Sequence, residues 1–214
     1  MPKRDHPLTS SAITLIPESP TLAKVREAAA DCQACDLWRT GTQTVFGEGR
    51  TQAEVMFIGE QPGDQEDRAG KPFVGPAGQL LDQALVKAGI ERDKTYVTNV
   101  VKHFKWVAKG KRRIHQTPDA WEIAACKPWL NTEIALIKPQ VIVCLGATAA
   151  QALLGKEFRV TRHRGEFIES PLAPFVIATV HPSAILRIPD EAARVAAMNQ
   201  FIEDLKRVAT QLHH

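Results

Sequence analysis

The 214-residue sequence has no run of eighteen apolar residues, so it predicts no membrane-spanning helix. Its first twenty residues lack the apolar segment of a secretory signal peptide, and we expect residues 1–19 to form a flexible leader. We therefore expect a cytoplasmic protein whose four cysteines stay reduced or bind metal instead of forming disulfides. No internal repeat or low-complexity segment divides the chain, and residues 20–214 are predicted to fold as a single, monomeric domain.

The sequence also has little net charge, only +3, which by itself does not indicate a nucleic-acid partner. The positive charge is nevertheless concentrated in one segment. No acid interrupts this segment before Asp119, and its basic residues are Lys102, Lys105, Lys109, Lys111, Arg112 and Arg113. Its end, "KGKRRIH", shows neither helical nor strand periodicity and predicts an irregular loop. The clustered charge favours a phosphate backbone, but it does not explain why the segment ends in Ile114 and His115.

The rest of the chain alternates between buried strands and amphipathic helices. Strands are predicted within 53–59, 95–101, 139–146 and 175–180, and helices within 21–32, 75–90, 117–137, 147–155 and from Asp190 onward. This order predicts an α/β fold with a central, mainly parallel four-stranded sheet flanked by helices. Ligands of such folds bind beyond the carboxyl ends of the strands.

Three of the four predicted strand ends carry polar side chains suited to binding a base. The loop "GEQPGD" contains Glu60, Gln61 and Asp64, and it either presents backbone N–H groups to a ligand or is an acidic solvated turn. Asn99 offers both a donor and an acceptor, which can read a pyrimidine edge, although such residues are also common in turns. His181 follows the fourth strand.

Two apolar features near these ends have alternative interpretations. Phe73 can stack on a base or belong to the core. The segment Ile185, Leu186 and Arg187 can enter a base stack, as apolar wedges beside arginine do when a nucleotide is extruded, or it can be an ordinary strand-to-helix loop.

The cysteines suggest a metal site without defining the metal. Cys32 and Cys35 form a C-x-x-C pair, which is compatible with zinc, a redox pair or an iron–sulfur cluster. Cys126 joins them only if the fold brings it near. Cys144 lies within a predicted buried strand and is expected to be inert.

Taken together, the motifs resemble the iron–sulfur uracil-DNA glycosylases, similar to family 4. The resemblance extends from Cys32 to Arg187 and is carried, in order, by "GEQPGDQED", "FVGPAGQLLD", "YVTNVVK", "AACKPWL", "LGATAAQALLG" and "TVHPSAILR". It implies the uracil-DNA glycosylase fold, and an enzyme that extrudes uracil from DNA and cleaves the bond between base and sugar.

The resemblance also implies a [4Fe–4S] cluster. Cys32, Cys35 and Cys126 match three of the family's cluster ligands, and His103 stands at the fourth position. We expect His103 to be the fourth ligand, because histidine replaces thiolate at some iron–sulfur centres. The alternative is a surface histidine beside a three-cysteine cluster.

His103 and the insertion "KGKRRIH" resemble the UdgX-type members of this group, which remain covalently attached to the deoxyribose through a loop histidine. By this resemblance His115 captures the sugar, and we expect Glu60 to hold its other ring nitrogen. Ile114 is expected to pack the loop down.

The remaining expected roles concern uracil and DNA. His181 donates to the leaving uracil, Asp64 shapes the loop or stabilises the sugar cation, and Phe73, Asn99 and the backbone near Gln61 bind the base. Phosphates are bound by Lys109, Lys111, Arg112 and Arg113.

Two other functions remain open at this stage. One is an ordinary hydrolytic glycosylase that leaves an abasic site, with an incidental loop histidine. The other is a non-catalytic damage-binding protein with a structural Cys/His metal site. In each case the expected partner is uracil-containing DNA, with single strands preferred because extrusion costs least there.

Overall fold

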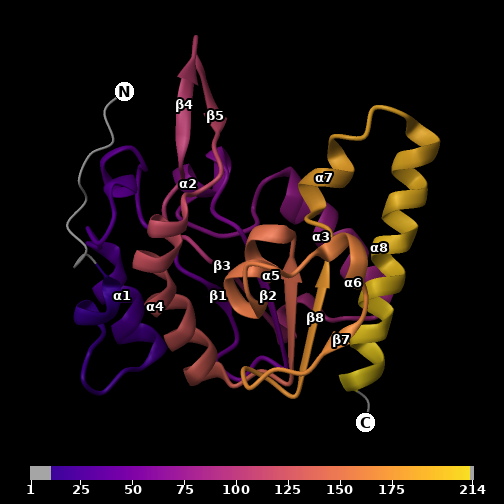
Figure 1. Ribbon diagram of the computed structural model, residues 1–214, viewed down its shortest axis with the longest axis horizontal. Coiled ribbons are helices and arrows are strands. Elements are labelled where there is room, and N and C mark those ends of the chain that lie inside the picture. The colour runs from indigo at the N-terminus through magenta and orange to yellow at the C-terminus, as the bar shows by residue number, and fades with distance from the viewer. Residues whose placement is uncertain (1–10, 213–214) are drawn as a thin grey trace.

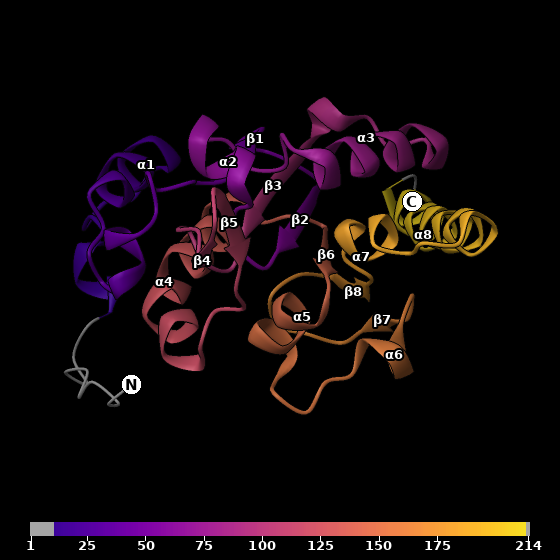
Figure 2. The same cartoon turned by 90° about the horizontal axis from the view of Figure 1, so that it is seen from above.

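The computed structural model describes residues 11–212, which form a sheet covered by helices on both faces (Figures 1 and 2). The sheet has six strands in the order β1-β3-β2-β6-β8-β7. Its four central strands, β3, β2, β6 and β8, are parallel, and the two-residue edge strands pair antiparallel. The strands are β1 (Glu48–Gly49), β2 (Val55–Gly59), β3 (Thr95–Asn99), β6 (Val141–Leu145), β7 (Phe167–Ile168) and β8 (Phe175–Thr179).

Eight α-helices and three 3₁₀ helices surround the sheet in the described part of the chain. They are α1 (Leu22–Ala30), α2 (Asp64–Ala69), α3 (Pro76–Ala88), α4 (Ala120–Ile137), α5 (Ala147–Leu154), α6 (Val160–His163), α7 (Pro182–Leu186), α8 (Glu191–Leu212), η1 (Ala12–Leu15), η2 (Asp36–Arg39) and η3 (Arg92–Lys94). No helix among residues 11–212 is long and apolar enough to span a membrane.

Strand side chains alternate between two cores, one on each face of the sheet. Val55 and Phe57 of β2 pack with α3 and α8, whereas Met56 and Ile58 pack with α1, α4 and α5. Figure 2 shows these two groups of helices on opposite sides of the sheet. Because both faces are buried, β2, β6 and β8 are nearly continuous apolar runs, which is why the sequence predicts them well, whereas β3 also buries Thr95, Thr98 and Asn99.

The fold confirms the predicted α/β class and corrects some details. The prediction of four strands omits the short edge strands β1 and β7, since two residues give no periodic signal. The predicted leader, residues 1–19, is only partly described, because residues 1–10 lie outside the described residues. Its second half is not a free leader: η1 contacts α4, and Ala12 is fully buried.

The basic segment is a β-hairpin and not the irregular loop that its sequence predicts. Strand β4 (Trp106–Lys109) pairs antiparallel with β5 (Arg112–His115), and Gly110 has a positive φ of 60° in the two-residue turn. Glycine at the first turn position is typical of type II′ hairpin turns. The hairpin projects from the end of the sheet at which the parallel strands finish (Figure 1).

Candidate active site

A cavity of about 610 Å³ lies at the carboxyl ends of the parallel strands. It combines residues from four strand ends and the hairpin. Among the predicted residues, its lining includes Glu60, Gln61, Phe73, Asn99, His115, His181 and Arg187. Binding sites of parallel sheets lie beyond the carboxyl ends of the strands. These residues follow such ends and therefore lie together, although they are up to 127 positions apart in the chain.

His115 and Glu60 meet at this cavity. His115 Nε2 lies 3.2 Å from Glu60 Oε1, and the hydroxyl of Thr148 donates to the other carboxylate oxygen, Oε2. Burial alone raises the pKa of Glu60, but the bonds from His115 and Thr148 outweigh burial and leave the pKa below its ordinary value. Glu60 is therefore an ionised acceptor for the imidazole. The side chain of His115 remains 49% exposed, so a substrate can reach it.

His181 faces the same cavity as a neutral imidazole. Burial lowers the pKa of His181 to about 4, which keeps the ring uncharged near neutral pH. The backbone N–H of Ser183 donates to His181 Nδ1 at 3.1 Å. Since Nδ1 accepts this bond, the ring proton resides on Nε2, and His181 presents an N–H donor.

Asn99 and Phe73 form a closely packed wall beside Gly59. A Cβ atom on Gly59 would lie 2.4 Å from Asn99 Oδ1 and 2.8 Å from Phe73 Cζ, so only glycine permits this approach. Phe73 has a positive φ of 56° and stacks on His181, with ring centroids 6.0 Å apart. Such backbone strain is typical of ligand-binding positions. The Asn99 side chain makes no hydrogen bond to residues 11–212, which leaves its donor and acceptor for a ligand.

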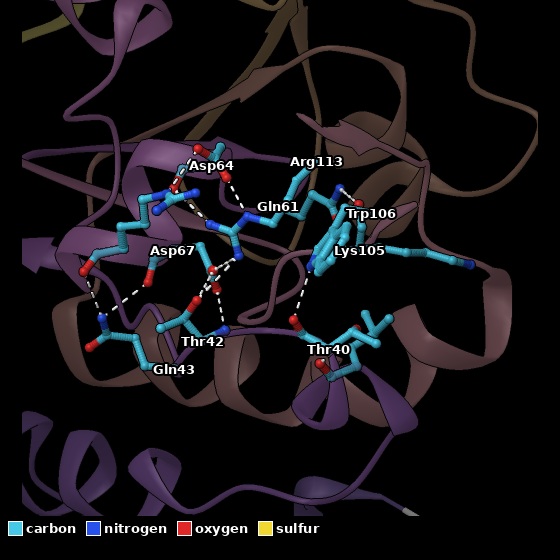
Figure 3. Close-up of polar contacts among 11 residues, drawn as sticks. Thr40, Thr42, Gln43, Gln61, Asp64, Asp67, Lys105, Trp106 and Arg113 are labelled. Carbon is cyan, nitrogen blue, oxygen red and sulfur yellow. Dashed lines mark hydrogen bonds and ion pairs between the residues drawn. The ribbon is translucent and has the colours of Figure 1, made fainter. Parts of the chain in front are cut away.

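Arg113 anchors the hairpin to the body of the protein (Figure 3). Its guanidinium donates to the carboxylate of Asp64 and, at 2.6 Å, to Asp67 Oδ2. Asp67 is fully buried and also accepts from the backbone N–H and the hydroxyl of Thr42. The side chain of Arg113 is only 13% exposed. A charge held this way positions the hairpin and is not available to phosphate.

Gln61 and Trp106 fix the base of the hairpin. The Gln61 amide bridges its two sides, because Nε2 donates to the carbonyls of Lys105 and Gln116 while Oε1 accepts from the Lys105 N–H. Trp106 Nε1 donates to the Thr40 carbonyl at 2.9 Å (Figure 3). These bonds hold β5, and with it His115, at the edge of the cavity. The side chain of Gln61 is thus structural, and only its backbone remains for the predicted base contact.

Comparison with known proteins agrees with this arrangement. Residues 46–206 match the family model described as the uracil DNA glycosylase superfamily. The chain belongs to this superfamily. Type-4 uracil-DNA glycosylases are similar over most of the chain: that of Thermotoga maritima is 42% identical over 164 residues, covering 76% of this chain and 82% of the relative. Those of Archaeoglobus fulgidus (40% over 172 residues; 77% and 82%) and Sulfurisphaera tokodaii (38% over 180 residues; 79% and 78%) are comparable.

In this superfamily member, the six basic residues of the charged segment divide into two groups. Lys102 is buried and pairs with Glu133 at 2.5 Å, and Lys105 pairs with Asp119 and Glu122. Together with Arg113, these residues are used inside the protein. The exposed remainder consists of Lys109, Lys111 and Arg112, and none of the three forms an ion pair within residues 11–212.

Within the hairpin, the alternation of side chains along β5 explains why Arg113 is bound inside the protein while Arg112 is exposed. Arg113 and His115 lie on one face of β5, toward the protein, because strand side chains alternate. Ile114 lies on the opposite face, is exposed, and pairs with the exposed Val107. The prediction that Ile114 packs the hairpin down is therefore wrong, since Arg113 performs that role. Asp64 binds Arg113 and Arg68 and does not line the cavity, which does not match its predicted catalytic role.

The predicted wedge segment also divides. Ile185 is 1% exposed and belongs to the core on the α3–α8 side of the sheet, so it cannot enter DNA. Leu186 is 43% exposed, and Arg187 lines the cavity. The short helix α7 turns one apolar side chain inward and the next outward, which the sequence alone did not separate.

The four predicted metal-site residues, Cys32, Cys35, Cys126 and His103, are all buried. Burial raises the pKa of Cys35 to about 11 and that of Cys126 to about 12, and both thiols interact electrostatically with Cys32. His103 is also buried, and its Nε2 lies 3.0 Å from the Thr44 hydroxyl. Among residues 11–212, no three His, Cys, Asp or Glu side chains are arranged as a metal site. Cys144 is fully buried within β6, where the sequence places it.

Two cavity residues escape the sequence analysis. Thr148 binds Glu60 from the start of α5, and Glu66 is a buried carboxylate whose Oε1 accepts from the Gly75 N–H. The sequence gives no periodic signal for Glu66, because α2 is polar apart from the exposed Ala69 and its buried residues are carboxylates. Thr148 gives no such signal, since its contact partner is 88 positions away.

Proposed function

We propose that this protein is a uracil-DNA glycosylase that excises uracil and becomes covalently attached to the deoxyribose through His115. Similarity to type-4 uracil-DNA glycosylases supports the excision. The observation that carries the covalent step is the imidazole of His115, held 3.2 Å from the Glu60 carboxylate at the edge of the cavity. An anchored imidazole at this position occupies the space that a hydrolytic water would need.

The cavity supplies recognition of uracil. Asn99 has a free donor and a free acceptor, which suit the N3–H and O4 of uracil, and cytosine presents the opposite pattern at this edge. Phe73 provides a stacking surface beside the base. Asn99 and Phe73 pack closely against Gly59, and a pocket this tight would exclude the thymine methyl group.

The chemistry follows from two imidazoles with different environments. As the bond between C1′ and N1 breaks, its electron pair leaves with uracil, and the Nε2–H of His181 donates to uracil O2. His115 donates one ring N–H to Glu60, so the lone pair of its other nitrogen forms the new bond to C1′. The resulting imidazolium keeps its proton beside the Glu60 carboxylate, which balances its charge.

DNA is held by residues outside this centre. Lys109, Lys111 and Arg112 are exposed on the hairpin, form no ion pair with residues 11–212, and suit phosphates. Arg187 lines the cavity and the neighbouring Leu186 is exposed, and these two side chains suit the space that an extruded nucleotide leaves. Single-stranded DNA is the preferred substrate, because no base pair must be broken.

We also propose a [4Fe–4S] cluster held by Cys32, Cys35, Cys126 and His103. The donor chemistry fits, because the thiols are buried together and two sulfurs accept N–H bonds: Trp129 Nε1 donates to Cys32 and the Lys102 N–H donates to Cys126. When bound, the cluster would supply structural support and no redox step. The contact between His103 Nε2 and the Thr44 hydroxyl links the proposed cluster site to the segment in which Thr42 binds Asp67.

The deciding experiment combines uracil-containing single-stranded DNA with the purified protein, followed by denaturing electrophoresis. A one-to-one adduct with free uracil is expected, and peptide mapping should place the DNA on His115. His115→Ser should lose the adduct yet still release uracil, because water can enter the vacated space. Wild-type protein that turns over without an adduct would instead be an ordinary hydrolytic glycosylase. Binding with neither adduct nor uracil release would identify a damage-binding protein.

A further inference from the structure

We infer that Thr148 is a positioning residue for the covalent step, acting through Glu60. This inference rests on the proposed function, since it concerns how His115 is oriented. The Thr148 hydroxyl donates to Glu60 Oε2, while Glu60 Oε1 faces His115 Nε2 at 3.2 Å. The three side chains come from α5, the end of β2 and the hairpin, so they meet only in the folded protein.

The hydroxyl has no role within its own helix. Thr148 is the second residue of α5, and the N-cap of that helix is Gly146, which has no side chain to form a cap. The one hydrogen bond of the Thr148 side chain within residues 11–212 goes to Glu60. Its location at the cavity wall also places it beside the substrate pocket and away from the two cores.

Fixing one carboxylate oxygen determines where the other one lies. Without the hydroxyl, the carboxylate of Glu60 can rotate about its terminal torsion, for which side chains have broad preferences. Glu60 Oε1 would then spend less time opposite His115, and the imidazole would lose both its orientation and its defined tautomer. Thr148 therefore contributes to nucleophile geometry without touching the reacting atoms.

The hydroxyl also affects the ionisation of Glu60. The titratable groups that face Glu60 are His115 from the hairpin and His181 from the end of β8, and Arg187 and Glu66 share the cavity. Burial raises the pKa of Glu60, and the Thr148 bond is one of the contacts that lower it again. Loss of this bond should move the pKa upward, so Glu60 would become protonated at a higher pH.

The test measures the first-order rate of adduct formation at saturating single-stranded uracil DNA, across pH. Thr148→Val keeps the shape and removes the hydroxyl, and it should slow the reaction roughly 10-fold or more, the usual effect of losing a hydrogen bond to a charged group. Its acid limb should move to higher pH. Thr148→Ser should stay within roughly twofold of wild type with an unmoved acid limb. Affinity for DNA should be unchanged in both.

Controls separate this inference from the proposed function. Thr132→Val removes a hydroxyl that donates to the Pro128 carbonyl within α4, and it should react like wild type. Thr148→Ala serves if the valine variant does not fold. If wild type forms the adduct and Thr148→Val matches it in rate and pH profile, the inference on Thr148 is wrong while the proposed function stands. If serine slows the reaction as much as valine, packing is responsible and the inference is again wrong. A wild type without an adduct would refute the proposed function itself.

Discussion

Arg112 and Arg113 are adjacent residues to which the sequence assigns the same role and the structure assigns different ones, and substituting each by methionine tests this difference directly. Arg113 points inward to Asp64 and Asp67, and Arg112 is exposed. From the sequence both are phosphate ligands. In the structure, Arg112 is the one of the two that is exposed and left for a phosphate, and Arg113 holds the hairpin that carries His115.

The magnitude for Arg113→Met follows from the burial of Asp67. Removing one partner of a buried ion pair costs about 3–5 kcal/mol, and the low end applies because Asp67 keeps both hydrogen bonds from Thr42. For a chain of this size, about 3 kcal/mol lowers Tm by roughly 6–12 °C. If the loss acts on hairpin docking, it reduces the docked fraction, and with it the adduct rate, by up to about 100-fold.

Arg112→Met should behave differently in each assay. It should leave Tm and the rate at saturating DNA near wild type. Its affinity for single-stranded DNA should become less salt-dependent, with the slope of log K against log salt smaller by about 0.7. The assays are differential scanning fluorimetry, a salt series of binding titrations and single-turnover adduct formation.

The two variants together make the reasoning refutable. If Arg113→Met reduced the salt slope as Arg112→Met does, while its Tm and adduct rate stayed normal, Arg113 would be a phosphate ligand. The anchoring role of Asp64 and Asp67 would then be wrong as well.

Further predictions concern the metal site, the pocket and pH. The purified protein should be brown and contain iron; Cys126→Ala should lose both properties and Cys144→Ala should retain them, whereas a colourless, zinc-loaded wild type would exclude the cluster. Asn99→Ala should reduce uracil release strongly, by roughly 10²-fold or more if two hydrogen bonds are lost. Wild-type protein should not react with thymine-containing DNA, and release of thymine at a rate comparable to that of uracil would contradict the pocket assignment. Burial lowers the pKa of His181 from 6.5 to about 4, so the unfolded chain binds a proton in this window that the folded chain does not, and the free energy of unfolding should fall as pH decreases from about 6.5 to 4. His181→Asn should make this fall smaller in denaturant titrations, and an equally steep fall in the variant would show that other groups cause it.

Much of the cavity could be predicted because its residues follow strands that the sequence identifies. Gly59 and Asn99 end adjacent parallel strands and are paired in register, so their side chains and loops must share one edge of the sheet. The same rule places His181 beyond β8. Prediction is reliable here because a strand buried on both faces is recognised from composition alone, and its direction determines where its end lies.

The sequence by itself determined the α/β class, the strand ends that form the cavity, and the presence of an unusually basic segment that ends in histidine. Tertiary structure alone decided which cations of that segment are free, because Arg113 meets Asp64 across 49 residues and Lys102 meets Glu133 across 31. It also decided that Ile185 is core while Leu186 is exposed, and that Thr148 orients Glu60. The physical reason is the same in each case. The sequence specifies which chemical groups each residue carries. Whether a charge is paired, a hydroxyl is hydrogen-bonded or an apolar side chain is buried depends on partners that only the folded chain brings within a few ångströms.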